Sequence, residues 1–508
     1  MSSQHHFQKL VEGGAPVGEV IGVDKFMVKA KGLQPINIHS LVLFEDGSKG
    51  IVHQIMPEHT LILHLGNTPV EPGEVVVRQH DELLCRVGKD FIGRVVSVSG
   101  QPLDGKGPIA ADGTRKVFNV APPLYQRKLL DTQLESGVLA VDGIFPIVRG
   151  QRMALLGDSK SGKSTLAAQL TINQKNTDQV VVYCLIAKRR SDIDALISKL
   201  ESTKSLENAI VVVSTMFDSL ISTYLAPYVA CSMAEYFWQE QDRDTIIIYD
   251  DLTSHAHAYR EISLLSGVSP GRDSYPGDMF YAHSSLLERA GRLETNGKHL
   301  TSIPLVLAAA GDITAYLPTN IMSITDGQWI LDMDIFRSGV RPALNTGLSV
   351  TRVGGVGHNK RQQALAAQTL RALAEFRQAE EFSHFGSSLS KDASIDLMLG
   401  KQIYQALGQR PEELYSLTEQ QLILETILMG EGKTEVNVEG LKKAVKNVGP
   451  KVKEEKDFDK EEAELFKKHA AQPVAAPAAA DGQANEKPAE SQPPPVAEKK
   501  EEAAHAAS

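Results

Sequence analysis

The stretch GDSKSGKST, residues 157–165, constrains the fold of this chain more than any other feature. It fits the pattern G-x-x-x-x-G-K-[ST], follows the apolar run QRMALLG and opens the segment GKSTLAAQL, which has helical composition. A strand, a glycine-rich loop and a helix in this order can surround a phosphate with backbone N–H groups and the positive end of the helix dipole. The sequence therefore predicts a phosphate-binding loop in an α/β domain.

Each residue of this loop has a predicted role. Backbone N–H groups from Ser159 to Thr165 are expected to surround the β-phosphate, and Lys163 is expected to reach the β- and γ-phosphate oxygens. The Ser164 hydroxyl is the predicted Mg²⁺ ligand. The nucleotide-binding residues that the loop supplies are Asp158, Ser159, Lys160, Ser161, Gly162, Lys163, Ser164 and Thr165.

A carboxylate should complete the magnesium site, because Mg²⁺ prefers oxygen ligands and such acids end a neighbouring apolar strand in proteins of this class. The run TIIIYDD meets this requirement. Asp250 is the predicted metal ligand, and Asp251 lies beside it. An exposed acidic turn is the alternative, but four apolar residues precede this pair. The predicted ligands are thus Mg²⁺ and ATP or ADP.

Hydrolysis needs a further group that orients or deprotonates the attacking water. In related hexameric motors a glutamate supplies it, shortly after the strand that follows the loop helix. That strand is QVVVYCLIA here, and Lys188, Arg189 and Arg190 come directly after it. A protonated lysine accepts no proton. The sequence therefore favours a chain that holds a nucleotide over one that hydrolyses it.

The distribution of apolar runs predicts a multidomain α/β chain. After a short segment, 1–15, residues 16–83 carry regularly spaced β-type runs, typical of a small closed barrel or a sandwich. Strands alternate with helical segments over 84–360, which indicates a parallel sheet with helices on both faces. Helical periodicity marks 361–450, and 451–508 form a charged, Ala/Pro-rich and largely disordered tail with one candidate charged helix.

Composition excludes several other classes. The three cysteines lie far apart, which argues against a disulfide framework or a zinc site. The N-terminal residues carry no signal-peptide core, and the longest apolar runs fall short of a membrane span. A formal net charge of -10 opposes binding to a polyanion, so nucleic acid is not an expected partner.

With the loop, TIIIYDDL and the missing base in view, the chain resembles the alpha subunit of F-type ATP synthase. Seven segments match that pattern in order: FEDGSKGI (44–51), GQPLDGKGPI (100–109), YLAPYVACSMAEYF (224–237), IYDDLTSHAHAYRE (248–261), SPGRDSYPGD (269–278), PTNIMSITDGQWIL (318–331) and SGVRPALNTGLSVTRVGG (338–355). The resemblance implies an N-terminal β-barrel, a RecA-like nucleotide domain and a C-terminal helical domain. It also implies a ring of three alpha and three beta subunits around a gamma shaft, with Mg-ATP on alpha turning over little.

The resemblance also assigns residues. The family's arginine finger falls on Arg352 in SVTRVGG, where it would act in the site of the adjacent beta subunit. The residues that the resemblance places in the adenine pocket are Phe336, Arg341, Pro342 and Gln409. Ser323 and Asp326 would lie close to the alpha–beta interface as structural residues. The implied location is peripheral, with indirect contact to the membrane sector. Because the N-terminal residues carry no transit segment, the cytoplasmic face of a bacterial inner membrane is favoured over an organelle.

The sequence departs from the family at several positions. Ser159 and Lys160 stand where alpha subunits usually carry Arg and Gln, and Lys188 stands where Gln is common. The added positive charge predicts that nucleotide is held at least as tightly as in ordinary alpha subunits. The helix that docks on the delta stalk subunit is mostly missing, so contact with the peripheral stalk is in doubt. These departures indicate a divergent member, which could belong to a second, atypical F-type operon.

Two other functions remain open from the sequence. One is a self-sufficient hexameric P-loop ATPase, such as an export motor or a Rho-like translocase, which would need the missing glutamate. The other is a scaffold with a vestigial site, which the intact Lys163, Ser164 and Asp250 oppose. ATP hydrolysis by the chain alone would distinguish the first of these from the alpha-subunit interpretation.

Overall fold

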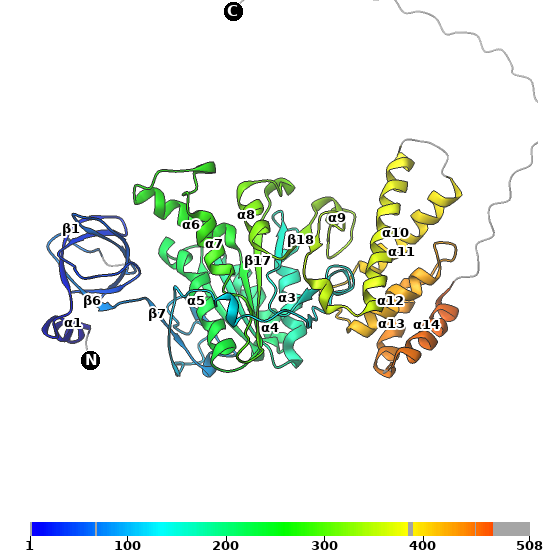
Figure 1. The fold of residues 1–508 in the computed structure, drawn as a ribbon, viewed down its shortest axis with the longest axis horizontal. Coiled ribbons are helices and arrows are strands. Elements are labelled where there is room, and N and C mark those ends of the chain that lie inside the picture. The colour runs from blue at the N-terminus through cyan, green and yellow to red at the C-terminus, as the bar shows by residue number, and fades with distance from the viewer. Residues whose placement is uncertain (1–2, 67–68, 385–389, 453, 471–508) are drawn as a thin grey trace, which may run out of the picture.

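A computed structural model of the chain describes residues 3–66, 69–384, 390–452 and 454–470. A small barrel, a large α/β domain and a helical domain follow one another along the long axis (Figure 1). This architecture confirms the predicted fold class. The disordered tail predicted after residue 470 lies outside the described residues. Within those residues, no helix is both long enough and apolar enough to cross a membrane.

The N-terminal strands close into a barrel in the order β1-β2-β5-β4-β3-β6, so the barrel and not the sandwich is formed. The strands are β1 (Val17–Asp24), β2 (Met27–Lys31), β3 (Leu41–Phe44), β4 (Lys49–Ile55), β5 (Thr60–His64) and β6 (Val75–His80). Buried Val28, Val42 and Ile62 belong to one cluster inside it. Helix α1 (Ser3–Glu12) packs on the barrel, since Phe7 clusters with buried side chains of β3 and β6.

The α/β domain is built on a nine-stranded sheet in the order β19-β18-β12-β17-β15-β13-β14-β8, with β16 paired to β17. Strands β19 and β16 run antiparallel to their neighbours, and the other pairs are parallel. The strands are β8 (Val95–Ser97), β12 (Ala154–Gly157), β13 (Val180–Lys188), β14 (Ala209–Thr215), β15 (Thr245–Asp250), β16 (Gly291–Arg292), β17 (His299–Leu307), β18 (Gly327–Leu331) and β19 (Val350–Thr351). Two small sheets pair β7 (Leu84–Val87) with β9 (Gly113–Lys116) and β10 (Gln133–Leu134) with β11 (Ile147–Val148).

Helices cover both faces of this sheet, as a run of apolar residues in a parallel strand requires. Along β13, Val182 and Cys184 belong to the core under α5 to α8, whereas Val181 and Leu185 belong to the core under α3 and α4. The helices are α2 (Leu139–Asp142), α3 (Lys163–Asn173), α4 (Arg190–Ser202), α5 (Leu220–Gln239), α6 (Leu252–Leu265), α7 (Met279–Leu287), α8 (Tyr316–Ile324) and α9 (Met333–Arg337). Short 3-10 helices are η1 (Lys89–Phe91), η2 (Leu124–Gln126), η3 (Gln174–Asn176), η4 (Ser205–Asn208), η5 (Arg272–Ser274), η6 (Ala309–Gly311), η7 (Gly354–Gly357) and η8 (Gly449–Lys451).

The C-terminal domain consists of packed helices that extend to residue 469. They are α10 (Lys360–His384), α11 (Lys391–Leu407), α12 (Leu417–Met429), α13 (Val438–Val448) and α14 (Glu455–His469). Helix α14 lies in the first part of the predicted tail, and its apolar Phe458, Leu465 and Phe466 join the core of this domain. Arg361 ties it down through ion pairs of 2.7 Å to Asp459 and 3.0 Å to Glu462.

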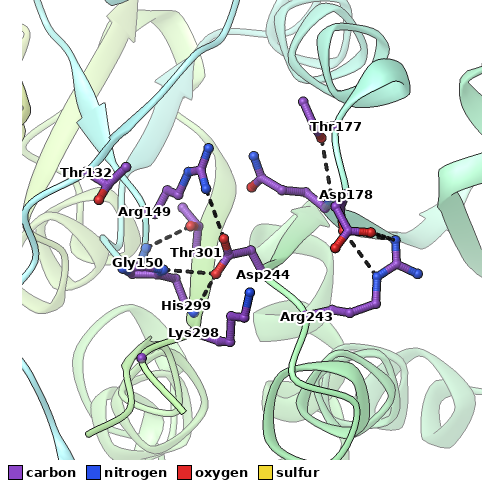
Figure 2. Close-up of polar contacts among 12 residues, drawn as sticks. Thr132, Arg149, Gly150, Thr177, Asp178, Arg243, Asp244, Lys298, His299 and Thr301 are labelled. Atoms are coloured by element: carbon purple, nitrogen blue, oxygen red, sulfur yellow. Dashed lines mark hydrogen bonds and ion pairs between the residues drawn. The ribbon is translucent and has the colours of Figure 1, made fainter.

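At the amino ends of the strands, Asp244 joins three strands of the sheet (Figure 2). Its carboxylate accepts hydrogen bonds from Arg149 Nη1 at 2.9 Å and from the backbone N and Nδ1 of His299 at 2.9 Å each. Arg149 lies before β12, whereas Asp244 precedes β15 and His299 begins β17. Burial alone would raise the pKa of Asp244, but these donors outweigh it and lower that pKa to about 2.

This depressed pKa predicts a pH-dependent contribution to stability. A carboxyl group whose folded pKa is below its unfolded value of about 3.9 stabilises the fold above pH 4, and this stabilisation is lost as the pH falls toward 2. Asp244→Asn should therefore lower the free energy of unfolding at pH 7 by about 1 to 2 kcal/mol, allowing for partial solvent screening. Chemical denaturation at pH 7 and pH 3 measures it, and the difference from the parent chain should shrink at pH 3.

Asp178 offers a matched control, because it also pairs with an arginine on this face (Figure 2) but its side chain is 88% exposed. Asp178→Asn should change stability little at either pH. An Asp244→Asn effect that is equal at both pH values would contradict the assigned role of the ionised carboxylate.

Candidate nucleotide-binding site

The phosphate loop connects the carboxyl end of β12 to α3, as the sequence predicts. Lys160 and Gly162 adopt positive φ angles of 62° and 102°, so the loop turns sharply before the first helical residue, Lys163. A Cβ atom at Gly157 would lie 2.6 Å from Ser161 Oγ and 2.9 Å from the Leu331 carbonyl oxygen, which only glycine avoids. Strand, loop and helix thus place the N-terminus of α3 at the carboxyl ends of the sheet strands.

The polar groups of the loop suit an anion. Lys163 Nζ donates to the carbonyl oxygens of Gly157 and Asp158 at 2.8 and 2.7 Å, so its ammonium already lies over the loop. The Ser161 hydroxyl is buried and has no hydrogen-bond partner among the described residues. Ser164 and Thr165 are exposed in the first turn of α3. Burial lowers the pKa of Lys163, and nearby Asp251 and Asp250 oppose this effect.

Asp250 lies at the carboxyl end of β15, where the sequence predicts it, but its carboxylate is already bound. Lys188 Nζ lies 2.6 Å from Asp250 Oδ1 and 3.2 Å from Asp251 Oδ2. The Tyr183 hydroxyl donates to Asp250 Oδ2 at 3.2 Å. Burial alone would lower the pKa of Lys188, but the two carboxylates reverse this effect and raise it above the ordinary lysine value. Lys188 is therefore protonated at neutral pH.

This arrangement fits Mg²⁺ only in part. The exposed Ser164 hydroxyl is a ligand of the expected type. The Asp250 carboxylate, however, has one oxygen on an ammonium and the other on a phenol. As folded, both oxygens of the Asp250 carboxylate already have a partner, and the assignment of Asp250 as a magnesium ligand stays a prediction.

The end of β13 also decides what chemistry the loop can support. Lys188 is the last residue of that strand, and Arg190 begins α4 after it. No carboxylate follows the strand before α4 begins. Lys188, which pairs with Asp250 and Asp251, is a protonated lysine and cannot accept a proton.

The four predicted adenine-pocket residues lie together. The Arg341 guanidinium stacks over the Phe336 ring at 4.4 Å, and the Gln409 backbone N donates to the Arg341 carbonyl oxygen at 2.6 Å. Pro342 follows Arg341 directly. The Gln409 side-chain amide, by contrast, accepts from Leu139 N at 3.0 Å and donates to the carbonyl oxygens of Gly137 and Glu413. That amide therefore joins the α/β and helical domains, a contact that nothing in the sequence indicates.

Arg352 lies apart from the loop, directly after the edge strand β19. Its backbone N donates to the Asp326 carbonyl oxygen at 3.0 Å and its Nη1 to the Thr325 carbonyl oxygen at 3.2 Å, while the residue remains exposed. Asp326 is itself fixed by Arg152, which donates through Nε at 2.9 Å and Nη2 at 2.7 Å. Ser323 donates to the Thr319 carbonyl oxygen at 2.8 Å within α8. Arg352 thus stands on an outer edge of the domain, on a firmly held backbone.

Sequence reasoning did not identify Tyr183 or Arg152 as parts of these sites. Tyr183 stands within the apolar run of β13, where nothing marks it as the donor to Asp250. Arg152 resembles any surface arginine until the β12–β18 pairing brings it to Asp326. Only the register of the sheet could have revealed either contact.

A glycine-rich loop between a central parallel strand and a helix, with an acidic strand end nearby, defines a P-loop nucleotide-binding protein. Residues 137–351 match the ATP synthase alpha/beta family, nucleotide-binding domain. Residues 360–472 match the ATP synthase alpha/beta chain, C terminal domain.

Curated relatives agree with these matches. The chain is 38% identical over 465 residues to "ATP synthase subunit alpha" of Caldanaerobacter subterraneus subsp. tengcongensis, covering 89% of this chain and 92% of the relative. It is 40% identical over 398 residues to the Aquifex aeolicus subunit alpha, covering 78% and 79%. It is also 40% identical over 410 residues to "ATP synthase subunit alpha 2" of Legionella pneumophila, covering 77% and 78%. The chain belongs to the F-type ATP synthase alpha subunit family.

Proposed function

We propose that this chain is a non-catalytic, nucleotide-holding alpha subunit in the catalytic head of an F-type ATP synthase. It binds ATP or ADP at its phosphate loop and supplies Arg352 to the site of an adjacent beta subunit. The observation that carries the first part is Lys188, which stands at the end of β13 and binds Asp250 at 2.6 Å. A protonated lysine there cannot deprotonate the attacking water.

The residues of the loop support tight binding without turnover. Lys163, the buried Ser161 hydroxyl and the N-terminus of α3 converge on the place where phosphates would lie. Phe336 and Arg341 offer a flat surface to a base. Asp158, Ser159, Lys160, Gly162, Ser164 and Thr165 complete the proposed contacts of the loop.

The proposed assembly is a ring in which this chain alternates with beta subunits around a gamma shaft. Large apolar side chains exposed on the α/β domain support an interface-rich chain: Val120 is 85% exposed, Leu124 86%, Leu129 88% and Phe217 86%. Contact with the peripheral stalk, through a delta subunit, and indirectly with the membrane sector would place the chain on the cytoplasmic face of a bacterial inner membrane. Nucleic acid has no part in this proposal.

A self-sufficient hexameric ATPase is the competing proposal, and membership of the alpha-subunit family opposes it. The purified full chain, incubated with ATP, tests the two. We expect stoichiometric nucleotide to remain bound after gel filtration, with no sustained release of phosphate. Sustained turnover by the chain alone would overturn the non-catalytic assignment.

Lys163→Ala tests the same site from the binding side. Losing one charge-assisted contact to the phosphates should weaken nucleotide binding by about 10- to 100-fold. Lys175→Ala is the matched control, because Lys175 is exposed and lies beyond the other end of α3. Equal affinity for both variants, measured by calorimetric titration, would contradict the loop as the binding site.

A further inference from the structure

Lys188 pairs with Asp250, the side chain that the sequence predicts as a Mg²⁺ ligand. The carboxylate at the end of β15 normally serves Mg²⁺, which in turn neutralises the β- and γ-phosphates. Here the Lys188 ammonium lies 2.6 Å from Asp250 Oδ1 and 3.2 Å from Asp251 Oδ2. A permanent positive charge is thus already bound between the two carboxylates at the carboxyl edge of the sheet.

The backbone at the end of β13 is shaped to place this lysine. The β13–β14 register shifts between Leu185 and Lys188, which is the mark of a bulge, and Ala187 adopts a positive φ of 51°. A bulge at a strand end redirects the side chain that follows it. A residue other than glycine in the left-handed region is rare and requires support from its surroundings.

The two carboxylates are held firmly in turn. Asp251 Oδ1 accepts from Ser254 N at 2.8 Å at the N-terminus of α6, and its other oxygen faces Lys188. The Tyr183 hydroxyl fixes the second oxygen of Asp250. Asp250 and Lys188 are 3% and 19% exposed at their side chains, so solvent competes little for their ion pair. A metal ion would have to compete with the ammonium and the phenol for the Asp250 oxygens.

We propose that the Lys188 ammonium takes the place of a divalent cation beside Asp250, so that this site binds free ATP or ADP with little dependence on Mg²⁺. The inference rests on the proposed nucleotide-holding function and specifies the charge state of its ligand.

Calorimetric titration of the nucleotide-free full chain with ATP, in Mg²⁺ and separately in EDTA, tests the proposal. For the parent chain the two dissociation constants should differ by at most about threefold, which is less than one charge-assisted contact contributes. For Lys188→Gln the affinity for ATP in EDTA should be more than about tenfold lower than the affinity of the same variant in Mg²⁺. Lys188→Arg, which keeps the charge, should stay close to the parent ratio.

Lys160→Gln is the matched control, because it also removes one positive charge but at a residue that does not contact Asp250. Lys160 lies in the phosphate loop, and its removal should weaken binding equally with and without Mg²⁺. Binding of Mn²⁺ alone, followed by electron paramagnetic resonance, gives a second measurement: Lys188→Gln should bind the ion more tightly than the parent chain does.

The outcomes separate the two proposals. A parent chain that needs Mg²⁺ as strongly as Lys188→Gln does would overturn the role of Lys188 and leave the nucleotide-holding function intact. A parent chain that binds no ATP in either buffer would overturn the nucleotide-holding function and this inference with it.

Discussion

Replacing Arg352 by alanine in the assembled complex is expected to lower the rate of ATP hydrolysis by about 10³- to 10⁵-fold. This loss corresponds to about 4 to 7 kcal/mol of transition-state stabilisation. The physical reason is that a guanidinium supplied from a neighbouring subunit neutralises charge that develops on the transferred phosphoryl group. Steady-state hydrolysis by a complex reconstituted with beta and gamma subunits measures the effect.

The structure explains why the loss of activity should be confined to the site of the neighbouring beta subunit. Arg352 is exposed, its side chain donates to the Thr325 carbonyl oxygen and its backbone N to that of Asp326, and neither contact involves the phosphate loop. Nucleotide bound to this chain should therefore be unchanged in the variant. Arg337→Ala is the control, since Arg337 is 72% exposed and pairs only locally, with Asp334 on the same helix. A complex that keeps full speed with Arg352→Ala would refute the proposed finger.

The parts of the site that could be predicted from sequence are those that a short segment determines by itself. The loop from Gly157 to Thr165 follows from its own glycines and from the strand and helix beside it. Asp250 ends a strand with three consecutive isoleucines and a tyrosine, so its place at the carboxyl edge of the sheet was predictable. Arg352 and the Phe336–Arg341 pair came from the family resemblance and not from physical reasoning.

The parts that could not be predicted depend on contacts between distant segments. Lys188 was predicted as an added charge for the triphosphate, and the register that aligns Leu185 with Asp250 also brings it to a carboxylate, a contact that the sequence does not reveal. Gln409 appeared to be a base-contacting residue, yet its amide binds backbone groups between two domains. In both cases the residue type suits more than one partner, and the contact within the protein depends on tertiary packing between distant segments.

The most buried ion pair in the α/β domain provides the second large expected effect. Arg289 and Glu235 have side chains only 1% and 0% exposed, and Arg289 Nε lies 2.7 Å from Glu235 Oε1. Arg289 also donates to Ser232 Oγ and to the Val117 carbonyl oxygen at 2.9 Å each. Burial alone would lower the pKa of Arg289, but surrounding negative groups reverse this and raise it, so the guanidinium stays charged in the core.

Removing one member of this pair should lower the free energy of unfolding by more than the intact ion pair adds to it. Glu235→Ala leaves a buried guanidinium without its counter-charge, and we expect a loss of about 3 to 5 kcal/mol in the free energy of unfolding. Replacing both members by apolar residues, Glu235→Leu with Arg289→Met, should recover most of that loss, because no uncompensated charge remains. Arg190→Ala, which breaks an exposed pair with Asp194, should cost under about 1 kcal/mol. Urea denaturation of the four chains decides the matter: a double variant as unstable as Glu235→Ala would show that packing, and not the unpaired charge, is what the core has lost.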